Sequence, residues 1–158
     1  MDEIKINFMR EAIRLAEEGS QAGHGGPFGA IIVCENRIVG KGYNQVVSSN
    51  DPTAHAEIQA IRMACQTLQT FKLENCEIYS SCEPCPMCLS AIYWARLQKI
   101  YFAATRHDAK RIGFDDAFLY EELVKLSHER QIPVEQLLFE EALTSMLRWE
   151  AMPNKTRY

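Results

Sequence analysis

His55-Ala56-Glu57 and Pro84-Cys85-Pro86-Met87-Cys88 are the two stretches around which this 158-residue chain is organised. Together they supply one imidazole and two thiols, which are ligand types that zinc prefers. Structural zinc sites are closed by four protein ligands, whereas catalytic sites use three and leave one position for water. Three ligands with a carboxylate close by therefore predict a hydrolytic zinc centre with one ion per chain.

Local helix geometry explains how these side chains can converge. Cys85 and Cys88 are three residues apart at the start of a predicted helix, so their sulfurs fall on one face, and Pro86 suits the first turn. His55 and Glu57 are two residues apart, and in a regular helix such residues point about 200° apart. They can share a site only in a first turn, so this helix should begin at or just before His55. The prediction is that His55, Cys85 and Cys88 bind the metal and that Glu57 is the catalytic acid and base.

Patterns on either side of these motifs predict an α/β chain. Apolar residues recur at helical spacing after residue 116 and in four other ranges, 3–19, 55–68, 86–96 and 137–149. Strand-like runs cover residues 28–34, 37–43, 77–81 and 99–104. The first two strands should form a hairpin, and the β-helix-β units that follow require parallel strands. We expect a mixed sheet, with an antiparallel hairpin followed by parallel strands, and helices on both faces.

Composition narrows the class of protein. With 47% hydrophobic residues, a chain of this length can bury a full core as one domain, residues 1–158. The net charge of -4 gives no excess of positive charge to neutralise a nucleic-acid backbone, so a small substrate is favoured over a polymer. The chain has no apolar run that could span a bilayer and no signal-peptide layout at its start. We therefore expect a cytoplasmic protein that binds neither nucleic acid nor membranes.

The remaining cysteines leave one alternative open. Cys82, three residues before Cys85, offers a different third sulfur, and a Cys-x-x-Cys pair can also form a structural knuckle. We interpret Cys82 as a buried residue at the end of a strand, and Cys34, Cys65 and Cys76 as core thiols of a reducing compartment. If the chain were instead a zinc-stabilised interaction module, Glu57→Gln would change nothing and zinc removal would unfold it.

Further motifs accompany the metal ligands. Together they are Gly25-Gly26-Pro27-Phe28-Gly29-Ala30, Ser49-Asn50-Asp51-Pro52-Thr53-Ala54-His55-Ala56-Glu57, Ser81-Cys82-Glu83-Pro84-Cys85-Pro86-Met87-Cys88, Ala91-Ile92-Tyr93-Trp94-Ala95-Arg96, Gly113-Phe114-Asp115-Asp116 and Tyr158. On these motifs the chain resembles the cytidine/deoxycytidylate deaminase superfamily, and within it the small bacterial guanine deaminases. The metal motif, which is the signature of zinc-dependent nucleobase deaminases, points to the superfamily. The aspartate pair and the final tyrosine point to guanine.

The resemblance implies a cytidine deaminase-like fold, a three-layer α/β/α arrangement with a mixed five-stranded sheet. It implies zinc-dependent hydrolysis of guanine to xanthine and ammonia, as in purine catabolism or salvage. It also implies that residues 150–158 form a C-terminal tail that closes an active site and is exchanged between the subunits of a homodimer. The substrate-binding residues that it implies are Phe28, Asn44, Ala56, Trp94, Asp116 and Tyr158.

Rival substrates remain within the same superfamily. A plant branch with similar Gly-Phe-Asp-Asp and terminal tyrosine features acts on guanosine, and other branches act on tRNA adenosine, cytosine or cytidine. The acidic charge and the absence of a basic, phenylalanine-rich C-terminal helix argue against tRNA. Trp94 and the tail are expected to limit the space beside the purine N9, which favours the free base.

Overall fold

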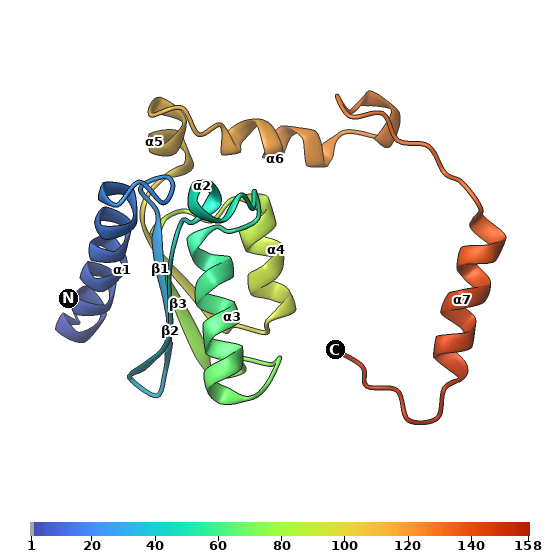
Figure 1. Cartoon of the computed structure of the whole chain (residues 1–158), viewed down its shortest axis with the longest axis horizontal. Coiled ribbons are helices and arrows are strands. Elements are labelled where there is room, and N and C mark those ends of the chain that lie inside the picture. Colours follow the sequence, from blue (N-terminus) through green and yellow to red (C-terminus); the bar gives the residue numbers. More distant parts are fainter. Residues whose placement is uncertain (1) are drawn as a thin grey trace. The chain divides into compact units, whose positions relative to one another are not determined.

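The structure is a computed structural model that describes residues 2–158. Residues 29–104 contain a sheet with the strand order β2-β1-β3-β4 (Figure 1). β1 pairs antiparallel with both β2 and β3, whereas β3 and β4 are parallel. The mixed α/β architecture and the antiparallel hairpin are confirmed. The strands are β1 (Gly29–Cys34), β2 (Arg37–Tyr43), β3 (Cys76–Cys82) and β4 (Lys99–Ala104).

One detail of the expected sheet is wrong. Four strands, and not five, occur in the described residues 2–158. Residues 131–138 carry apolar side chains but join no ladder, and a strand needs a hydrogen-bonding partner. The sequence leaves open which strand of the hairpin β3 joins. In the structure β3 lies beside β1, so the β2-helix-β3 crossover passes over one strand. β2 and β3 run in the same direction, but β3 and its neighbour β1 are antiparallel.

Helices cover both faces of the sheet, as expected. α1 (Glu3–Gln21) lies on one face, and α3 (Ala56–Leu68) and α4 (Pro86–Trp94) lie on the other (Figure 1). Successive side chains of a strand point to opposite faces, so β1 contributes side chains to two separate core clusters. Ile31 and Val33 pack in the cluster with α1, whereas Ala30 and Ile32 pack in the cluster with α3 and α4.

Small residues let α3 rest directly on β2. A Cβ atom at Gly42 would lie 2.3 Å from the carbonyl oxygen of Ala56, and one at Gly40 would lie 2.3 Å from that of Ala60. Any larger residue at these positions would push the helix off the sheet. This close packing fixes where α3 begins, and therefore where His55 and Glu57 lie.

The chain divides into two compact units, Met1–Tyr120 and Glu121–Tyr158. The short helices α2 (Val46–Ser49) and α5 (Arg106–Arg111), which apolar spacing does not reveal, belong to the first unit. Within Glu121–Tyr158 no residue is buried. None of the helices described is both long and apolar enough to cross a membrane. The remaining helices are α6 (Asp116–Val124), a 3-10 turn (Ser127–Glu129) and α7 (Phe139–Ala151).

Candidate metal centre and substrate cavity

Two helix N-termini carry the three expected metal ligands. His55 has extended backbone angles and is the N-cap of α3, so the helix begins one residue later than the spacing suggested. Cys85 is the N-cap of α4, Pro86 occupies the first turn, and Cys88 follows within that turn. Because the N-terminus of a helix is the positive end of its dipole, both thiols lie where the thiolate form is favoured.

The three ligand atoms lie at the separation that a zinc ion requires. Nδ1 of His55 is 3.6 Å from Sγ of Cys85 and 3.5 Å from Sγ of Cys88. Tetrahedral zinc with ordinary bond lengths holds nitrogen and sulfur ligands about 3.6 Å apart. The structure therefore brings together one imidazole and two sulfurs in an arrangement that fits zinc and leaves a coordination position open.

The charge states of these groups are coupled. Hydrogen bonds from Cys88 and His55 lower the pKa of the Cys85 thiol to about 4, with that from Cys88 the stronger. The hydrogen bond to Cys85, together with burial, raises the pKa of Cys88, so Cys88 is the thiol of the pair that keeps its proton. The hydrogen bond to Cys85 also raises the pKa of His55. A bound cation would replace these protons, because zinc binds thiolates and neutral imidazole.

Glu57 lies beside the ligands without being one of them. Its side chain is buried, Oε1 accepts a hydrogen bond from the Ser80 hydroxyl at 3.1 Å, and Oε2 accepts one from the Cys88 thiol at 3.3 Å. Burial is the main cause that raises the pKa of this carboxyl above its ordinary value. A carboxyl group with a raised pKa can both take and return a proton near neutral pH, which is what an acid and base catalyst must do.

A cavity of about 360 Å³ opens above the centre. Of the predicted site residues, Phe28, Asn44, His55, Glu57, Cys85 and Asp116 line it. Val46 and Val47 also line the cavity and were not predicted from the sequence. They belong to α2, which is too short to show a helical period. Phe114 was also missed as a wall residue, although it belongs to the quoted Gly-Phe-Asp-Asp motif; its ring meets that of Phe28 edge to face, with centroids 4.8 Å apart. Together the two rings form an aromatic side of the cavity.

Asn44 is held rigidly at the cavity wall. Its side chain is buried, and its Oδ1 accepts a hydrogen bond from the backbone N–H of Val46 at 3.1 Å. A Cβ atom at Gly25 would lie 2.1 Å from this oxygen, so only glycine fits there. With Oδ1 engaged, the amide nitrogen of Asn44 is the group that can donate to a ligand.

The two aspartates at the start of α6 have different roles. Asp115 accepts a hydrogen bond from the backbone N–H of Phe118 at 3.2 Å and pairs with Lys110 at 3.6 Å, so it caps the helix. Asp116 instead lines the cavity, and burial raises the pKa of its carboxyl. The cavity thus has a carboxylate on the wall formed by the start of α6 and a second one, Glu57, at the metal centre.

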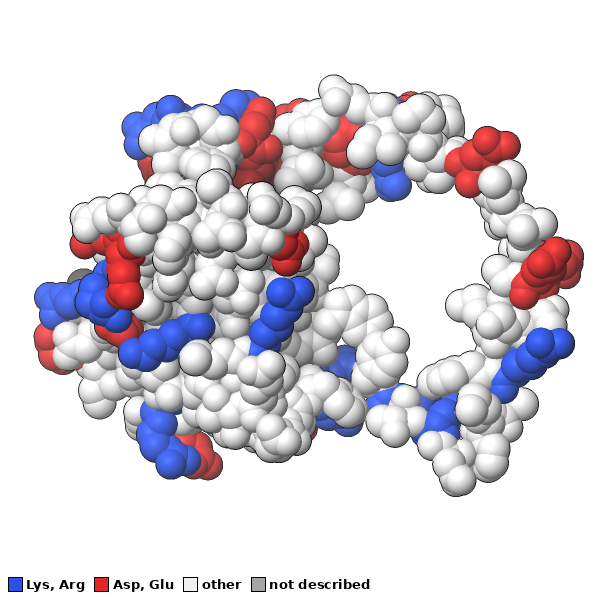
Figure 2. Space-filling view, in the orientation of Figure 1, with Lys and Arg blue, Asp and Glu red and all other residues white. Residues whose placement is uncertain are grey.

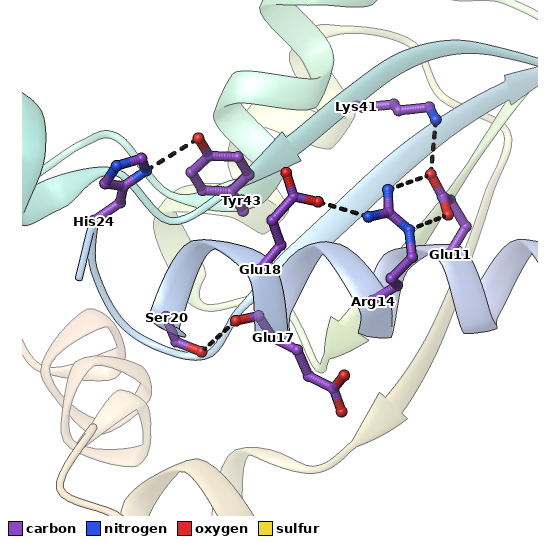
Figure 3. A network of polar contacts seen from close by, with 8 residues as sticks. All are labelled: Glu11, Arg14, Glu17, Glu18, Ser20, His24, Lys41 and Tyr43. Atoms are coloured by element: carbon purple, nitrogen blue, oxygen red, sulfur yellow. Dashed lines mark hydrogen bonds and ion pairs between the residues drawn. The ribbon is translucent and has the colours of Figure 1, made fainter. Parts of the chain in front are cut away.

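His24 anchors the loop that leads from α1 to the cavity. Its Nδ1 lies 3.0 Å from the Tyr43 hydroxyl and the two rings are stacked (Figure 3). Its carbonyl oxygen accepts hydrogen bonds from the backbone N–H groups of Val47 and Ser48 at 3.1 and 3.0 Å. Because Val47 lines the cavity, His24 holds the α2 wall in place.

A second anchor joins the metal loop to α6. The Arg106 guanidinium donates to Oε1 of Glu83 at 2.7 and 3.1 Å and stacks 4.0 Å over the ring of Tyr120. The Tyr120 hydroxyl donates to the carbonyl oxygen of Pro84 at 2.9 Å. The loop before Cys85 and the helix that begins with Asp116 are therefore tied to one another.

Two predicted substrate residues, Ala56 and Trp94, do not line the cavity of the first unit. Ala56 is the first residue of α3 and is fully buried in the core. Trp94 ends α4, whose opposite end carries Cys85, and its side chain is 64% exposed. Tyr158 belongs to the second unit, Glu121–Tyr158.

A histidine, two cysteines and a buried glutamate at the base of a cavity define a zinc-dependent deaminase centre. In agreement, residues 2–104 match the family described as the cytidine and deoxycytidylate deaminase zinc-binding region, and the chain belongs to this family. It is 50% identical over 151 residues to a guanine deaminase of Bacillus subtilis, covering 96% of this chain and 97% of the relative. The crystal structure of guanine deaminase from that organism superposes with a TM-score of 0.93, covering 96% of this chain and 97% of the other.

More distant relatives include a second guanine deaminase and a tRNA-specific adenosine deaminase. The structure of a guanine deaminase from Nitrosomonas europaea is 30% identical in sequence and superposes with a TM-score of 0.65. The match covers 89% of this chain and 81% of the other chain. A tRNA-specific adenosine deaminase of Aquifex aeolicus is 37% identical over 149 residues, covering 94% of this chain and 85% of the relative. Family membership therefore identifies the chemistry, and the cavity must identify the substrate.

Proposed function

We propose that this protein is a zinc-dependent guanine deaminase that hydrolyses guanine to xanthine and ammonia. One observation carries the proposal: Asp116 and Glu57 line the same cavity, the first at the start of α6 and the second at the metal centre. The cavity wall that carries Asp116 is called the recognition wall. A carboxylate there selects a ring edge rich in hydrogen-bond donors. The 50% identity to a guanine deaminase over nearly the whole chain supports the same substrate.

Recognition follows from the hydrogen-bonding pattern of guanine. Asp116 accepts from the ring N–H and the amino group, and Asn44 donates to an acceptor on the purine. Adenine has an acceptor at N1 where guanine has a donor, so it would leave the carboxylate without its partner, at a cost of about 1–3 kcal/mol or more. Phe28 and Phe114 pack against the rings and limit the orientations that a planar base can adopt.

His55, Cys85 and Cys88 would hold the zinc ion, which supplies Lewis acidity and lowers the pKa of a coordinated water to about 7. Glu57 removes a proton from the water that attacks C2 of guanine. The same carboxyl returns protons to the ring nitrogen and to the departing amino group. Its hydrogen bond from Ser80 fixes the direction in which it faces the reacting atoms.

We also propose a homodimer in which residues 150–158 of one subunit close the active site of the other, with Tyr158 reaching the purine. The support is energetic: the second unit buries no residue, and yet it carries many large apolar side chains. Such a segment gains stability only when it packs on another surface. The exposed apolar residues include Ile132, Val134, Leu137, Phe139, Leu147, Trp149 and Tyr158.

A cytoplasmic location fits the thiol chemistry of the chain. All six cysteines are free thiols, and two of them are metal ligands in this proposal. Thiols persist in the reducing cytoplasm, whereas oxidising compartments favour disulfides.

The decisive assay follows the ultraviolet spectrum of zinc-loaded protein with guanine and, in parallel, with guanosine. Turnover of guanine alone supports the proposal. Turnover of guanosine alone would show that the cavity admits ribose and would replace guanine by its nucleoside. Activity with neither would overturn the guanine assignment, and an RNA adenosine substrate would then be tested.

On the face shown in Figure 2, Lys and Arg are interspersed with Asp and Glu, which favours a small substrate over a nucleic acid.

A further inference from the structure

Three cysteines lie at the end of the sheet that is remote from the metal centre. Cys34 is the last residue of β1, Cys76 is the first residue of β3, and Cys65 is in the last turn of α3. β3 has seven residues, so its extended length separates Cys76 from the metal loop by about 20 Å. None of these three thiols has a task in the proposed deamination.

Cys34 and Cys76 are direct partners in the antiparallel ladder between β1 and β3. Directly opposed residues of such strands have Cα atoms about 4.5–5.5 Å apart and side chains on the same face. Disulfides join Cα atoms about 4.4–6.8 Å apart, so a directly opposed pair has the backbone spacing that a disulfide requires.

The positions of the sulfur atoms agree with the backbone. Sγ of Cys34 lies 3.9 Å from the carbonyl oxygen of Asn75, and Sγ of Cys76 lies 3.8 Å from that of Glu74. Both thiols therefore lie over the same turn, and Cys34 is near enough to contribute to the raised pKa of the Cys76 thiol. Cys65 packs against the same core cluster and has only an electrostatic effect on the pKa of Cys76.

The two thiols differ in their access to solvent. Cys76 is 1% exposed and lies in the core, whereas Cys34 is half-buried at the rim. Burial raises the pKa of the Cys76 thiol to about 12, so Cys76 is not the thiol that an oxidant attacks first. A soluble oxidant therefore reaches Cys34 first, and Cys76 is placed to react with the product.

We propose that Cys34 and Cys76 are a redox modification site, which hydrogen peroxide converts to a disulfide and a thiol reductant reopens. Peroxide oxidises the Cys34 sulfur to a sulfenic acid and releases one water. The Cys76 sulfur then attacks the Cys34 sulfur, forms the S–S bond and displaces the second water. Two thiols lose two electrons and two protons in all, and the peroxide is reduced to two waters.

The bridge would close the segment of residues 35–75, which contains Asn44, His55 and Glu57. A disulfide across a loop of this length restricts the unfolded chain and stabilises the folded one. Because the backbone already has the required spacing, the cavity at the other end of the sheet is unchanged. Oxidation therefore makes the protein harder to unfold without changing its turnover.

The test uses the full-length, zinc-loaded protein with hydrogen peroxide as the probe. Remaining thiols are alkylated with iodoacetamide, and the protein is cut with trypsin and a protease that cleaves after glutamate. Cleavage after Glu74 and Glu77 separates Cys76 from the cysteines of the metal loop. We expect a linked pair of peptides that contains Cys34 and Cys76, is two hydrogens lighter, and is reversed by dithiothreitol. The melting temperature should rise by about 5 °C on oxidation.

Matched variants keep the proposal falsifiable. Cys34→Ser, at the half-buried rim position, should fold and lose both the linked peptides and the rise in melting temperature. Cys65→Ser should retain both. A link through Cys65, or the absence of any Cys34–Cys76 link in the oxidised wild-type protein, would overturn the proposal. Because these readouts do not use guanine, they stand or fall independently of the substrate assignment.

Discussion

The two ends of the central sheet each hold three cysteines, and their environments differ. At one end lie Cys82, Cys85 and Cys88, where hydrogen bonds from Cys88 and His55 lower the pKa of Cys85 to about 4. At the other end lie Cys34, Cys65 and Cys76, where burial raises the pKa of Cys76 to about 12.

Helix α3 contributes to both ends in opposite ways. Its N-terminus presents positive partial charge beside His55, and its C-terminal turn presents negative partial charge around Cys65. The metal end therefore supplies a thiolate at Cys85, whereas the other end holds Cys76 as a neutral thiol that packs as an apolar group. Backbone position, more than residue type, decides what these cysteines do.

The largest effect should come from Glu57→Gln at the metal end. Removing the acid and base should lower turnover of guanine by about 10²–10⁴-fold, while zinc content and fold are retained. Glu77→Gln, on the same strand as Ser80 but at the opposite end, is the matched control and should keep activity. The rate of xanthine formation measures turnover, and metal analysis measures the zinc content of each variant. Activity of Glu57→Gln close to that of the wild type would reduce the centre to a structural zinc site.

Replacing one cysteine at each end tests the contrast directly. Cys88→Ser should lower zinc affinity by at least roughly 100-fold, because it removes a thiolate ligand. Cys76→Ser should keep one zinc per chain and lose about 1–3 kcal/mol of unfolding free energy, because it buries a hydroxyl in the core. Metal analysis measures zinc binding, and urea unfolding measures the change in unfolding free energy. Zinc loss in Cys76→Ser would erase the distinction between the ends.

The recognition wall at the metal end is tested by Asp116→Asn. An amide cannot accept from both donors of the guanine edge as a carboxylate does, so kcat/KM for guanine should fall by about 100-fold. Asp115→Asn is the control, since Asp115 caps α6, and it should change kcat/KM far less. Equal losses in the two variants would assign both aspartates to the helix and remove the argument for guanine.

The smallest effect concerns neither end but the surface network of α1 and β2 (Figure 3). Hydrogen bonds from Arg14 and Lys41 lower the pKa of Glu11 to about 2. A carboxyl whose folded pKa is depressed stabilises the fold above its unfolded pKa, and this stability is lost as the pH falls toward 2. Glu11→Gln should therefore lower unfolding free energy by about 1 kcal/mol or less at pH 7, and the difference should vanish in acid. A difference that stays constant with pH would rule out the ion pairs as its cause.

Features set by local sequence could be predicted, because spacing alone controls them. The ligands at two helix N-termini and the ranges of α1, α3, α4 and α7 follow from periodicity and short motifs. The strand order does not, because β3 could have paired with either strand of the hairpin. For the same reason, the opposition of Cys34 and Cys76 could not be found from the sequence. Val46 and Val47 reach the cavity from a helix too short to show a period.

A catalytic zinc ion held by His55, Cys85 and Cys88 is central to the proposed activity. Zinc titration into metal-free protein, with xanthine formation followed at each step, tests it most directly. We predict that activity rises in proportion to zinc and reaches its plateau at one ion per chain, in the wild type and in Cys76→Ser alike. Full activity of the metal-free protein, or a plateau at a different stoichiometry, would contradict the account.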